Sequence, residues 1–249
     1  MPFPRAKANC YNAGLHVPLA ICWGRKIVSG QVVDDLFSMV DLAPTILEAA
    51  GLKFDGAFPM AGASNYKILT SGNFKKPQGQ QEIFAGRERH SSARYENKGY
   101  PQRTIRTGKY LYIKNYHPGY WPSGDPQVYS DENTPGEMHR AYLDIDDSPT
   151  LRYYKNTNTN DPAFLPLFLA AVAKRPSEEL YDIVNDPDCL VNLAGKQGYE
   201  DVTRQLSGRL VSRLKETGDP RETGSNPEIW ETYPRLKGVI RKFPVQNSY

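Results

Sequence analysis

The sequence of 249 residues has few cysteines, no long hydrophobic run and no marked excess of either charge. No stretch reaches the 18 apolar residues that a membrane-spanning helix requires, and no charged segment followed by an apolar one marks a signal peptide. The three cysteines, Cys10, Cys22 and Cys189, show no ligand spacing, which argues against a zinc site and a disulfide framework. The formal charge of +3 is too small to indicate a nucleic-acid-binding protein.

Turn-forming and aromatic residues are abundant instead. The chain has 20 Gly, 20 Pro and 16 Tyr, and its mean hydropathy is -0.61. This composition is typical of a turn-rich globular protein, and tyrosine rings with their polar tips suit contact with carbohydrate. The length can hold one large domain or two small ones, and it is ample for a buried core.

The first part of the sequence predicts a piece of an α/β domain. The continuous apolar run Val17–Trp23 indicates a strand buried on both faces, as in a parallel sheet covered by helices. Apolar residues then recur at helical spacing over residues 36–50. If this helix begins at Asp41, Pro44 lies in its first turn, where proline is tolerated, and Gly51 can end it.

A change of composition separates this part from the rest of the chain. Residues 54–81 are rich in Gly, Pro, Ser, Asn and Lys without periodicity, which predicts a loop or a domain seam. We therefore expect two domains, residues 1–80 and 81–249. The second has the pattern of an antiparallel sheet with one solvent-exposed face. Its predicted strands span residues 82–86, 103–107, 109–114 and 179–183, its predicted helices span 165–174 and 199–215, and residues 116–161 read as an irregular loop.

Five phrases spread over nearly the whole chain carry a resemblance to a known family. They are "PFPRAKANCYNAGLHVPLAICW", "VDLAPTILEAAG", "GRERHSSARYENKGYPQRTIRTGKYLYIKNYHPGYWPSGDP", "EELYDIVNDPDCLVNLA" and "LKETGDPRETGSNPEIWETYPR". In this order they resemble the C-terminal part of the sulfatase family, and more particularly its N-sulfoglucosamine sulfohydrolase branch.

The resemblance implies a fold and a cofactor. The chain would be the C-terminal remnant of an alkaline-phosphatase-like α/β sheet domain, followed by a smaller α+β subdomain whose antiparallel sheet packs on a helix. In the family, the Pro-Phe-Pro stretch follows an Asp-Asn pair that ligates calcium, so we expect Ca²⁺ in the full-length enzyme and no metal ligand in this chain. The nucleophile is also expected upstream, because none of Cys10, Cys22 and Cys189 lies in the C/S-x-P/A-x-R motif that is converted to formylglycine.

Two cations near the start of the chain are candidates for contact with sulfate. Cleavage of a sulfate ester or sulfamate needs cationic donors that stabilise charge as the S–O or S–N bond breaks. The resemblance places the family's sulfate-gripping basic residue at Lys7, which we take as the catalytic candidate. Arg5 is two residues away and could be the gripping side chain instead. The alternative is that both are solvated surface cations, and we favour it for Arg5.

The run Arg87-Glu88-Arg89-His90 follows a predicted strand and begins a loop, a common location for ligand-reading side chains. Guanidinium groups such as that of Arg89 suit sulfate or carboxylate through paired hydrogen bonds, and the imidazole of His90 can bond a sugar hydroxyl. The resemblance places a histidine near the sugar pocket at His90. The alternative is a solvated charge run whose Arg–Glu pairs fix the loop.

Aromatic residues between prolines offer a further candidate for sugar contact. His117 and Trp121 lie in "NYHPGYWPSGDP" and could form a sugar-stacking wall, although aromatic residues in such a setting more often brace a loop. His16 and His139 have no partner at metal-ligand spacing.

The resemblance implies hydrolysis of a sulfate ester or sulfamate on a sulfated glycan, with N-sulfoglucosamine of heparan-type chains as the favoured substrate. The expected partners are a sulfated saccharide and the N-terminal catalytic part of the same enzyme, with no nucleic acid and no membrane. The family resemblance implies a periplasmic, secreted or lysosomal enzyme.

Two alternatives stay open: another alkaline-phosphatase-like hydrolase, such as a phosphodiesterase, and a non-catalytic module that binds polyanions or glycans. The chain alone should lack sulfatase activity, because the nucleophile and the metal carboxylates are expected upstream.

Overall fold

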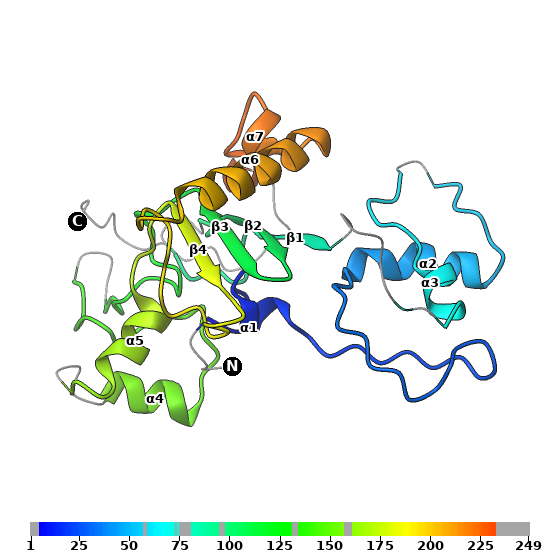
Figure 1. Cartoon of the computed structure of the whole chain (residues 1–249). Coiled ribbons are helices and arrows are strands. Elements are labelled where there is room, and N and C mark those ends of the chain that lie inside the picture. Colours follow the sequence, from blue (N-terminus) through cyan, green and yellow to red (C-terminus); the bar gives the residue numbers. More distant parts are fainter. Residues whose placement is uncertain are drawn as a thin grey trace.

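Four antiparallel strands in the order β1-β2-β3-β4 form the centre of the computed structural model (Figure 1). The structure describes residues 5–56, 59–72, 74, 81–94, 98–130, 134–156 and 161–232. The strands are β1 (Glu82–Arg87), β2 (Gln102–Thr107), β3 (Tyr110–Asn115) and β4 (Glu178–Asp182). The helical elements are α1 (Asn12–Leu15), η1 (Met39–Asp41), α2 (Leu42–Ala49), α3 (Tyr66–Thr70), α4 (Pro149–Asn156), α5 (Leu165–Val172), α6 (Glu200–Glu216), α7 (Pro220–Thr223) and α8 (Ile229–Thr232). The four predicted strands and the two predicted helices of the second half are confirmed, with small shifts at their ends.

One face of the sheet packs on α6, as the four-residue step of leucines along that helix indicates. Phe84 pairs with Ile105, Ile105 with Tyr112, and Tyr112 with Leu180, so one row of apolar side chains crosses all four strands. This row packs against the buried face of α6, formed by Leu206, Leu210 and Leu214. Burial of this apolar surface is the main stabilising contribution that α6 makes.

The opposite face of the sheet is covered as well, so the prediction of a solvent-exposed face is wrong. Leu111, Ile113 and Tyr181 pack against Cys10 and Tyr11 of the segment that leads into α1, and all five are buried. The alternation along β3 suggested an open face because the covering segment lies about a hundred residues away in sequence, beyond the reach of a local pattern. Figure 1 shows α1 lying against the sheet.

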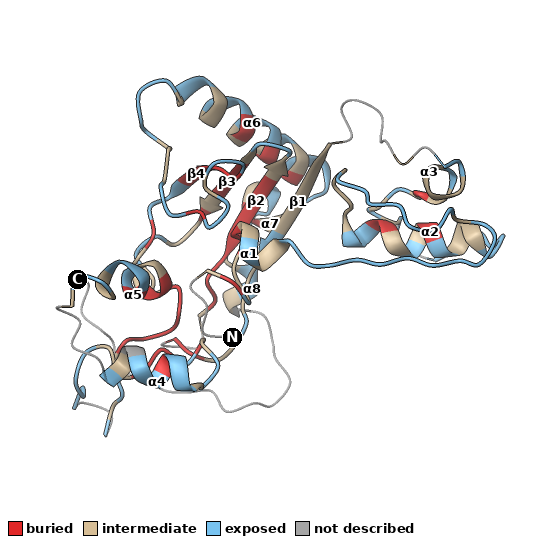
Figure 2. Ribbon diagram, turned by 60° about the horizontal axis from the view of Figure 1, so that its bottom comes forward, coloured by how far each residue is buried: buried red, intermediate tan, exposed pale blue. Residues whose placement is uncertain are grey.

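The apolar run Val17–Trp23 is not a buried strand, which corrects that prediction. These residues are extended, and Val17, Leu19, Ile21 and Trp23 are each between 38% and 50% exposed. A strand is buried on both faces only when other strands flank it and helices cover it. In the described part of the chain no strand pairs with this run, so its apolar side chains face solvent. Figure 2 shows the connection from α1 to the region of α2 and α3 as an exposed segment that is not a strand.

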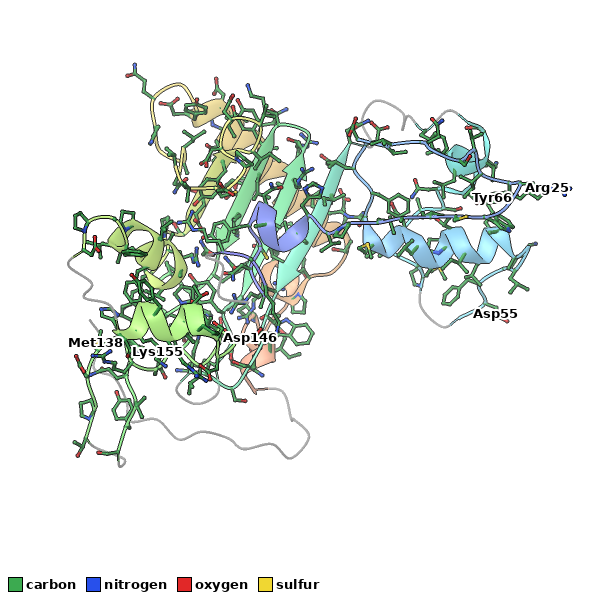
Figure 3. The ribbon with its side chains drawn as sticks, turned by 90° about the horizontal axis from the view of Figure 1, so that it is seen from below. Arg25, Asp55, Tyr66, Met138, Asp146 and Lys155 are labelled. Atoms are coloured by element: carbon green, nitrogen blue, oxygen red, sulfur yellow. The ribbon has the colours of Figure 1, made fainter. Side chains whose placement is uncertain are left out.

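Helices α2 and α3 form an arm beside the sheet, held together by polar contacts. Pro44 lies in the first turn of α2 and Gly51 follows the helix with φ of +69°, both as predicted. Asp41 occupies the N-cap position of α2, but its side chain makes no capping hydrogen bond there. Its carboxylate accepts hydrogen bonds from the backbone of Ala63 at 2.9 Å and from the side chain of Asn65 at 3.1 Å, which joins α2 to the start of α3. Figure 3 shows Arg25, Asp55 and Tyr66 at the far end of this arm.

Two short helices lie in segments that were predicted to be irregular, α3 in residues 54–81 and α4 in residues 116–161. Helix α4 has a start signal that was overlooked: Pro149 occupies its first position, and the Ser148 hydroxyl accepts a hydrogen bond from the backbone of Leu151 at 3.1 Å. Figure 3 places Lys155 on this helix and Asp146 just ahead of it. No helix in the described ranges combines the length and the apolar character needed to cross a membrane.

Candidate functional site

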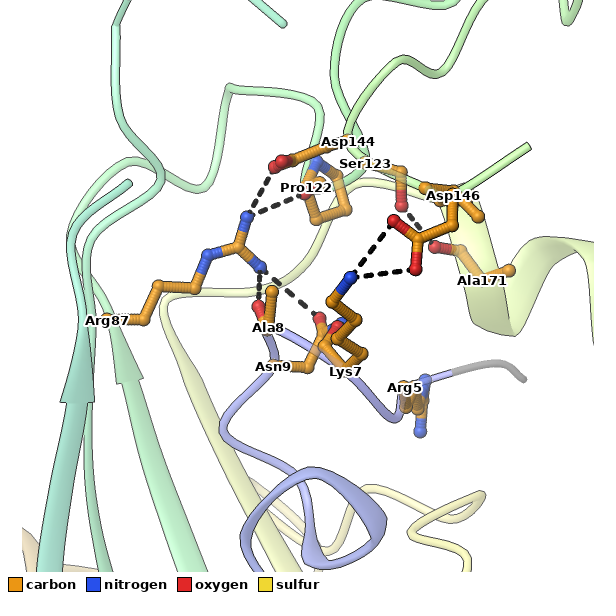
Figure 4. Close-up of a pocket in the computed structure, with 11 residues that line it drawn as sticks. Arg5, Lys7, Ala8, Asn9, Arg87, Pro122, Ser123, Asp144, Asp146 and Ala171 are labelled. Atoms are coloured by element: carbon orange, nitrogen blue, oxygen red, sulfur yellow. Dashed lines mark hydrogen bonds and ion pairs between the residues drawn. The ribbon is translucent and has the colours of Figure 1, made fainter. Parts of the chain in front are cut away.

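A small charged pocket lies where the segment ahead of α1 meets the end of β1 and the loops around Pro122 and Asp144 (Figure 4). Water-sized spheres fit within a volume of about 20 Å³. Its charged lining consists of three cations and two carboxylates: Arg5, Lys7, Arg87, Asp144 and Asp146. With Ala171 of α5, segments from five distant parts of the sequence line the pocket, and cations outnumber anions there.

Lys7 is the solvent-accessible cation of this lining. Its Nζ donates to both carboxylate oxygens of Asp146, at 2.8 and 3.0 Å, and the two side chains are 51% and 47% exposed. The pKa of Asp146 is lowered to about 2, and the hydrogen bond from Lys7 is the largest of the causes. An exposed pair of this kind contributes little to stability and can separate at low cost, so the ammonium is available to another anion.

The favoured interpretation of Arg5 as a solvated surface cation is wrong, because the protein binds its guanidinium. Its guanidinium lies over the Tyr11 ring, 4.7 Å from the centroid, and its Nε donates to the backbone carbonyl of Ala170 at 3.2 Å. It also donates to the backbone carbonyl of Cys189 and to the Tyr181 hydroxyl. With these contacts Arg5 joins the segment ahead of α1 to β4 and the end of α5.

Asp144 gathers four donors beside the pocket. Its Oδ2 accepts from Arg87 at 2.7 Å and from Arg94 at 2.8 Å, and its Oδ1 accepts from the Ser91 hydroxyl at 2.7 Å and lies 3.0 Å from His90 Nδ1. The carboxylate side chain is 2% exposed. Burial alone would raise the pKa of Asp144, but the charges of Arg94 and Arg87 and the hydrogen bonds outweigh burial and lower it. Burial also lowers the pKa of Arg87 to about 10.

Lys7 and His90, the two residues predicted to contact sulfate and sugar, are thus brought to the same short segment. Asp144 holds His90 and Asp146 holds Lys7, with one residue between the two aspartates. The sequence reading missed both aspartates because it treated residues 116–161 as an irregular loop. The pattern that could have indicated them is the acidic run "LDIDD", whose charge is opposite to that of the basic "GRERH" run.

Arg89 and His117 point elsewhere, toward the region of α8. Arg89 Nη2 donates to the backbone carbonyl of Trp230 at 3.1 Å and contacts Glu231 at 3.3 Å. His117 Nε2 lies 3.1 Å from Glu228, and its ring stacks on Tyr120 with 4.7 Å between centroids. The structure therefore does not bring these two side chains into the pocket that contains Lys7.

A buried arginine connects the same region to the loop after β1. Arg221 on α7 is 1% exposed and pairs with Glu88 at 2.6 Å, Glu228 at 3.1 Å and Glu231 at 3.2 Å. Burial alone would lower the pKa of Arg221, but the hydrogen bond and the charge of Glu88 and the charge of Glu228 raise it. Arg103 on β2 also binds Glu88, at 2.5 Å. This ionic network fixes the position of the loop that bears Arg89 and His90. For Glu88, the structure therefore agrees with the alternative in which Arg–Glu pairs fix the loop.

Trp121 braces the loop that forms one wall of the pocket. Its ring packs edge-on against the buried Tyr142 ring, 6.4 Å between centroids, and the Lys174 ammonium lies 5.2 Å from its ring centroid. Its backbone carbonyl accepts a hydrogen bond from Arg94 at 2.7 Å. These contacts place Trp121 in the support of the loop beside Pro122.

The described residues do not fit a calcium site. No three His, Cys, Asp or Glu side chains gather in the described ranges with the geometry to hold a metal ion. Asp144, the most enclosed carboxylate at the pocket, faces two guanidinium groups, and Asp146 faces the ammonium of Lys7. Hard cations need several unpaired oxygen ligands, and these carboxylates are already neutralised by cations.

The family model described as N-sulphoglucosamine sulphohydrolase, C-terminal, matches residues 6–157, which include every residue of the pocket lining except Arg5 and Ala171. The chain belongs to this family. The match confirms the resemblance to the C-terminal part of the sulfatases, and the antiparallel sheet packed on α6 confirms the mixed α and β character of the fold.

Two curated relatives of this sulphohydrolase-family chain are both ulvan-active sulfatases of Formosa agariphila. One is 27% identical over 215 residues, which is 86% of this chain and 36% of the relative, and the other is 26% identical over 223 residues, 88% of this chain and 32% of the relative. The chain thus spans about a third of the length of these relatives.

Two solved structures are also similar. The putative sulfatase yidJ from Bacteroides fragilis has a TM-score of 0.46 and 14% identity, over 86% of this chain and 30% of that chain. BT4656, solved in complex with its substrate D-glucosamine-2-N,6-O-disulfate, has a TM-score of 0.41 and 20% identity, over 73% of this chain and 25% of that chain.

Proposed function

We propose that this chain is the C-terminal part of a sulfatase that removes sulfate from a sulfated glycan, with the N-sulfate of glucosamine as the favoured group. Membership of the N-sulphoglucosamine sulphohydrolase C-terminal family supports the sulfamate, and the two ulvan-active relatives support sulfate on a polysaccharide. The observation that carries the proposal is the pocket itself, where the exposed Lys7 lines the wall with two further cations and where Asp144, also in the lining, contacts His90.

Lys7 would contact the sulfate group. Hydrolysis breaks the S–N or S–O bond, the sulfur gains a hydroxyl from water, and the leaving nitrogen or oxygen gains the proton. Negative charge grows on the groups around sulfur as the bond breaks, and a preorganised ammonium stabilises that charge more than it stabilises the ground state. For this role Lys7 exchanges its exposed partner Asp146 for a sulfate oxygen.

The N-terminal catalytic part of the same enzyme would supply the formylglycine nucleophile and the calcium site. Exposed large apolar side chains within residues 32–54 support such a partner, because apolar side chains left on a surface often mark an interaction site. Val32 is 87% exposed, Ile46 63% and Phe54 51%. We place the division between the catalytic α/β domain and the C-terminal subdomain at residues 1–80 and 81–249, although the segment ahead of α1 packs on the sheet of the second.

The test is sulfate release by the protein encoded by this gene together with the sequence immediately upstream of it. We expect release of sulfate from glucosamine N-sulfate or from an ulvan oligosaccharide, and no turnover by the 249-residue chain alone. Hydrolysis of a phosphodiester without sulfate release would contradict the proposal in favour of another alkaline-phosphatase-like hydrolase. Binding of the glycans without any turnover by the extended protein would contradict it in favour of a binding module.

A further inference from the structure

The carboxylate of Asp144 can only accept hydrogen bonds. Its pKa is lowered by the charges of Arg94 and Arg87 despite burial, so the group is ionised at neutral pH. Both oxygens already accept hydrogen bonds: Oδ2 from two guanidinium groups, which have only donors, and Oδ1 from the Ser91 hydroxyl. An ionised carboxylate has no proton to give. The contact of 3.0 Å between Oδ1 and His90 Nδ1 therefore needs its hydrogen on the histidine.

We propose that Asp144 is a positioning residue that holds neutral His90 in the tautomer with hydrogen on Nδ1, so that Nε2 is presented as a hydrogen-bond acceptor. The hydrogen bond made by one ring nitrogen fixes the protonation of the other. His90 Nε2 makes no hydrogen bond to any described residue, and the side chain is 32% exposed, so the lone pair on this nitrogen is available to a ligand.

An acceptor at this position selects the chemistry of its ligand. A neutral imidazole nitrogen pairs with a donor, such as a sugar hydroxyl or the N–H of a sulfamate, and it does not pair with sulfate oxygens, which are acceptors themselves. Lys7, which has only donors, has the opposite preference. Asp144 and Asp146 thus hold two side chains of complementary hydrogen-bonding character, one for the sugar and one for the sulfate. The identity of the ligand rests on the proposed function, whereas the tautomer does not.

His117 provides a comparison within the same chain, because it contacts a carboxylate through the other ring nitrogen. It meets the carboxylate of Glu228 through Nε2 at 3.1 Å, whereas His90 meets Asp144 through Nδ1. Glu228 also accepts from Arg221 at 3.1 Å, so its carboxylate is likewise the acceptor. The same argument then assigns hydrogen to Nε2 in His117, and the two histidines should give opposite tautomers in one spectrum.

The tautomers can be read from long-range ¹H–¹⁵N NMR spectra of the ¹⁵N-labelled 249-residue chain. Spectra are recorded as a pH series, and the tautomer of each ring is read where its two ¹⁵N shifts show one protonated and one unprotonated nitrogen. Single His→Gln variants assign the four histidine spin systems. We expect the Nδ1–H pattern for His90 and the Nε2–H pattern for His117. An Nε2–H pattern for His90 in the wild-type chain would overturn the proposal without recourse to any variant.

Two variants separate positioning from general stability. In Asp144→Asn the amide oxygen should stay with the two guanidinium groups, which places the amide N–H₂ against His90 Nδ1 and reverses the tautomer to Nε2–H. Ser91→Ala removes another hydrogen bond to the same carboxylate and should leave the tautomer unchanged. A folded Asp144→Asn chain, judged by circular dichroism, that keeps the Nδ1–H pattern would contradict the proposal. If Asp144→Asn does not fold, the wild-type spectrum decides.

The ligand is tested on the chain extended by its upstream sequence, with glucosamine N-sulfate and its deoxyfluoro analogues, each of which lacks one hydroxyl donor. If His90 Nε2 accepts from a hydroxyl, one analogue should bind the wild-type chain about five- to tenfold more weakly, as expected for one lost hydrogen bond. His90→Ala should abolish that difference. A difference that persists in His90→Ala would overturn the sugar contact. Absence of any glucosamine N-sulfate binding would contradict the proposed function and leave the tautomer result standing.

Discussion

Replacement of Arg221 by glutamine should destabilise the fold more than any exposed charge replacement. The Arg221 side chain is 1% exposed and pairs with Glu88, Glu228 and Glu231. Removing one partner of a buried ion pair leaves uncompensated charge in a poorly solvated place, which typically costs about 3–5 kcal/mol.

The contacts that survive set the magnitude near the lower end of that range. Glu88 keeps Arg103 at 2.5 Å, Glu231 keeps Arg89 at 3.3 Å, and Glu228 is 45% exposed and can be solvated. We therefore expect a loss of about 3 kcal/mol in the free energy of unfolding. At roughly 2–4 °C per kcal/mol for a chain of this size, the melting temperature should fall by about 6–12 °C.

Urea unfolding followed by circular dichroism measures this loss, with Arg204→Gln as the matched control. Arg204 and its partner Asp201 on α6 are 76% and 93% exposed, so that variant should lose less than about 0.5 kcal/mol. A double-mutant cycle of Arg221→Gln with Glu88→Gln should give a coupling of about 1–3 kcal/mol. Equal stability losses for Arg221→Gln and Arg204→Gln would refute the reasoning.

Three further outcomes follow from the contacts described above. Leu210→Ala removes a fully buried side chain between α6 and the sheet and should cost about 2–5 kcal/mol in urea unfolding. The folded-state pKa of Asp144 is lowered, so its ionised form stabilises the fold above the ordinary carboxyl pKa of about 4, and the stability deficit of Asp144→Asn should shrink as the pH falls below that value. The exposed apolar residues of the arm, such as Ile46, should bind the dye ANS in the isolated chain, and extension by the upstream sequence should reduce this binding.

The elements that could be predicted from sequence are those that a local pattern specifies. Helix α6 follows from the four-residue step of its leucines, and the hairpin of β2 and β3 follows from alternation around Gly108. The run Val17–Trp23 has the pattern of a buried strand, but burial depends on neighbours that a pattern does not contain. The covered second face of the sheet was missed for the same reason, since Tyr11 comes from a distant segment.

The site was predicted in part. The sequence singled out Lys7 and His90; Lys7 lines the pocket, and His90 contacts Asp144, which also lines it. Asp144 and Asp146 were missed because the loop after β1 and the segment ahead of α1 come together only in the tertiary structure. No spacing in the sequence relates Asp144 to Arg87, which lies 57 residues earlier.

The measurement that tests the central claim most directly compares two variants of the extended protein on two substrates, a glycan that carries N-sulfated glucosamine and a small aryl sulfate. Lys7→Ala removes the donor to the sulfate itself and should lower kcat about a hundredfold or more on both substrates. His90→Ala removes the contact to the sugar and should impair only the glycan. An unchanged rate for Lys7→Ala, or equal losses on both substrates for His90→Ala, would contradict the account.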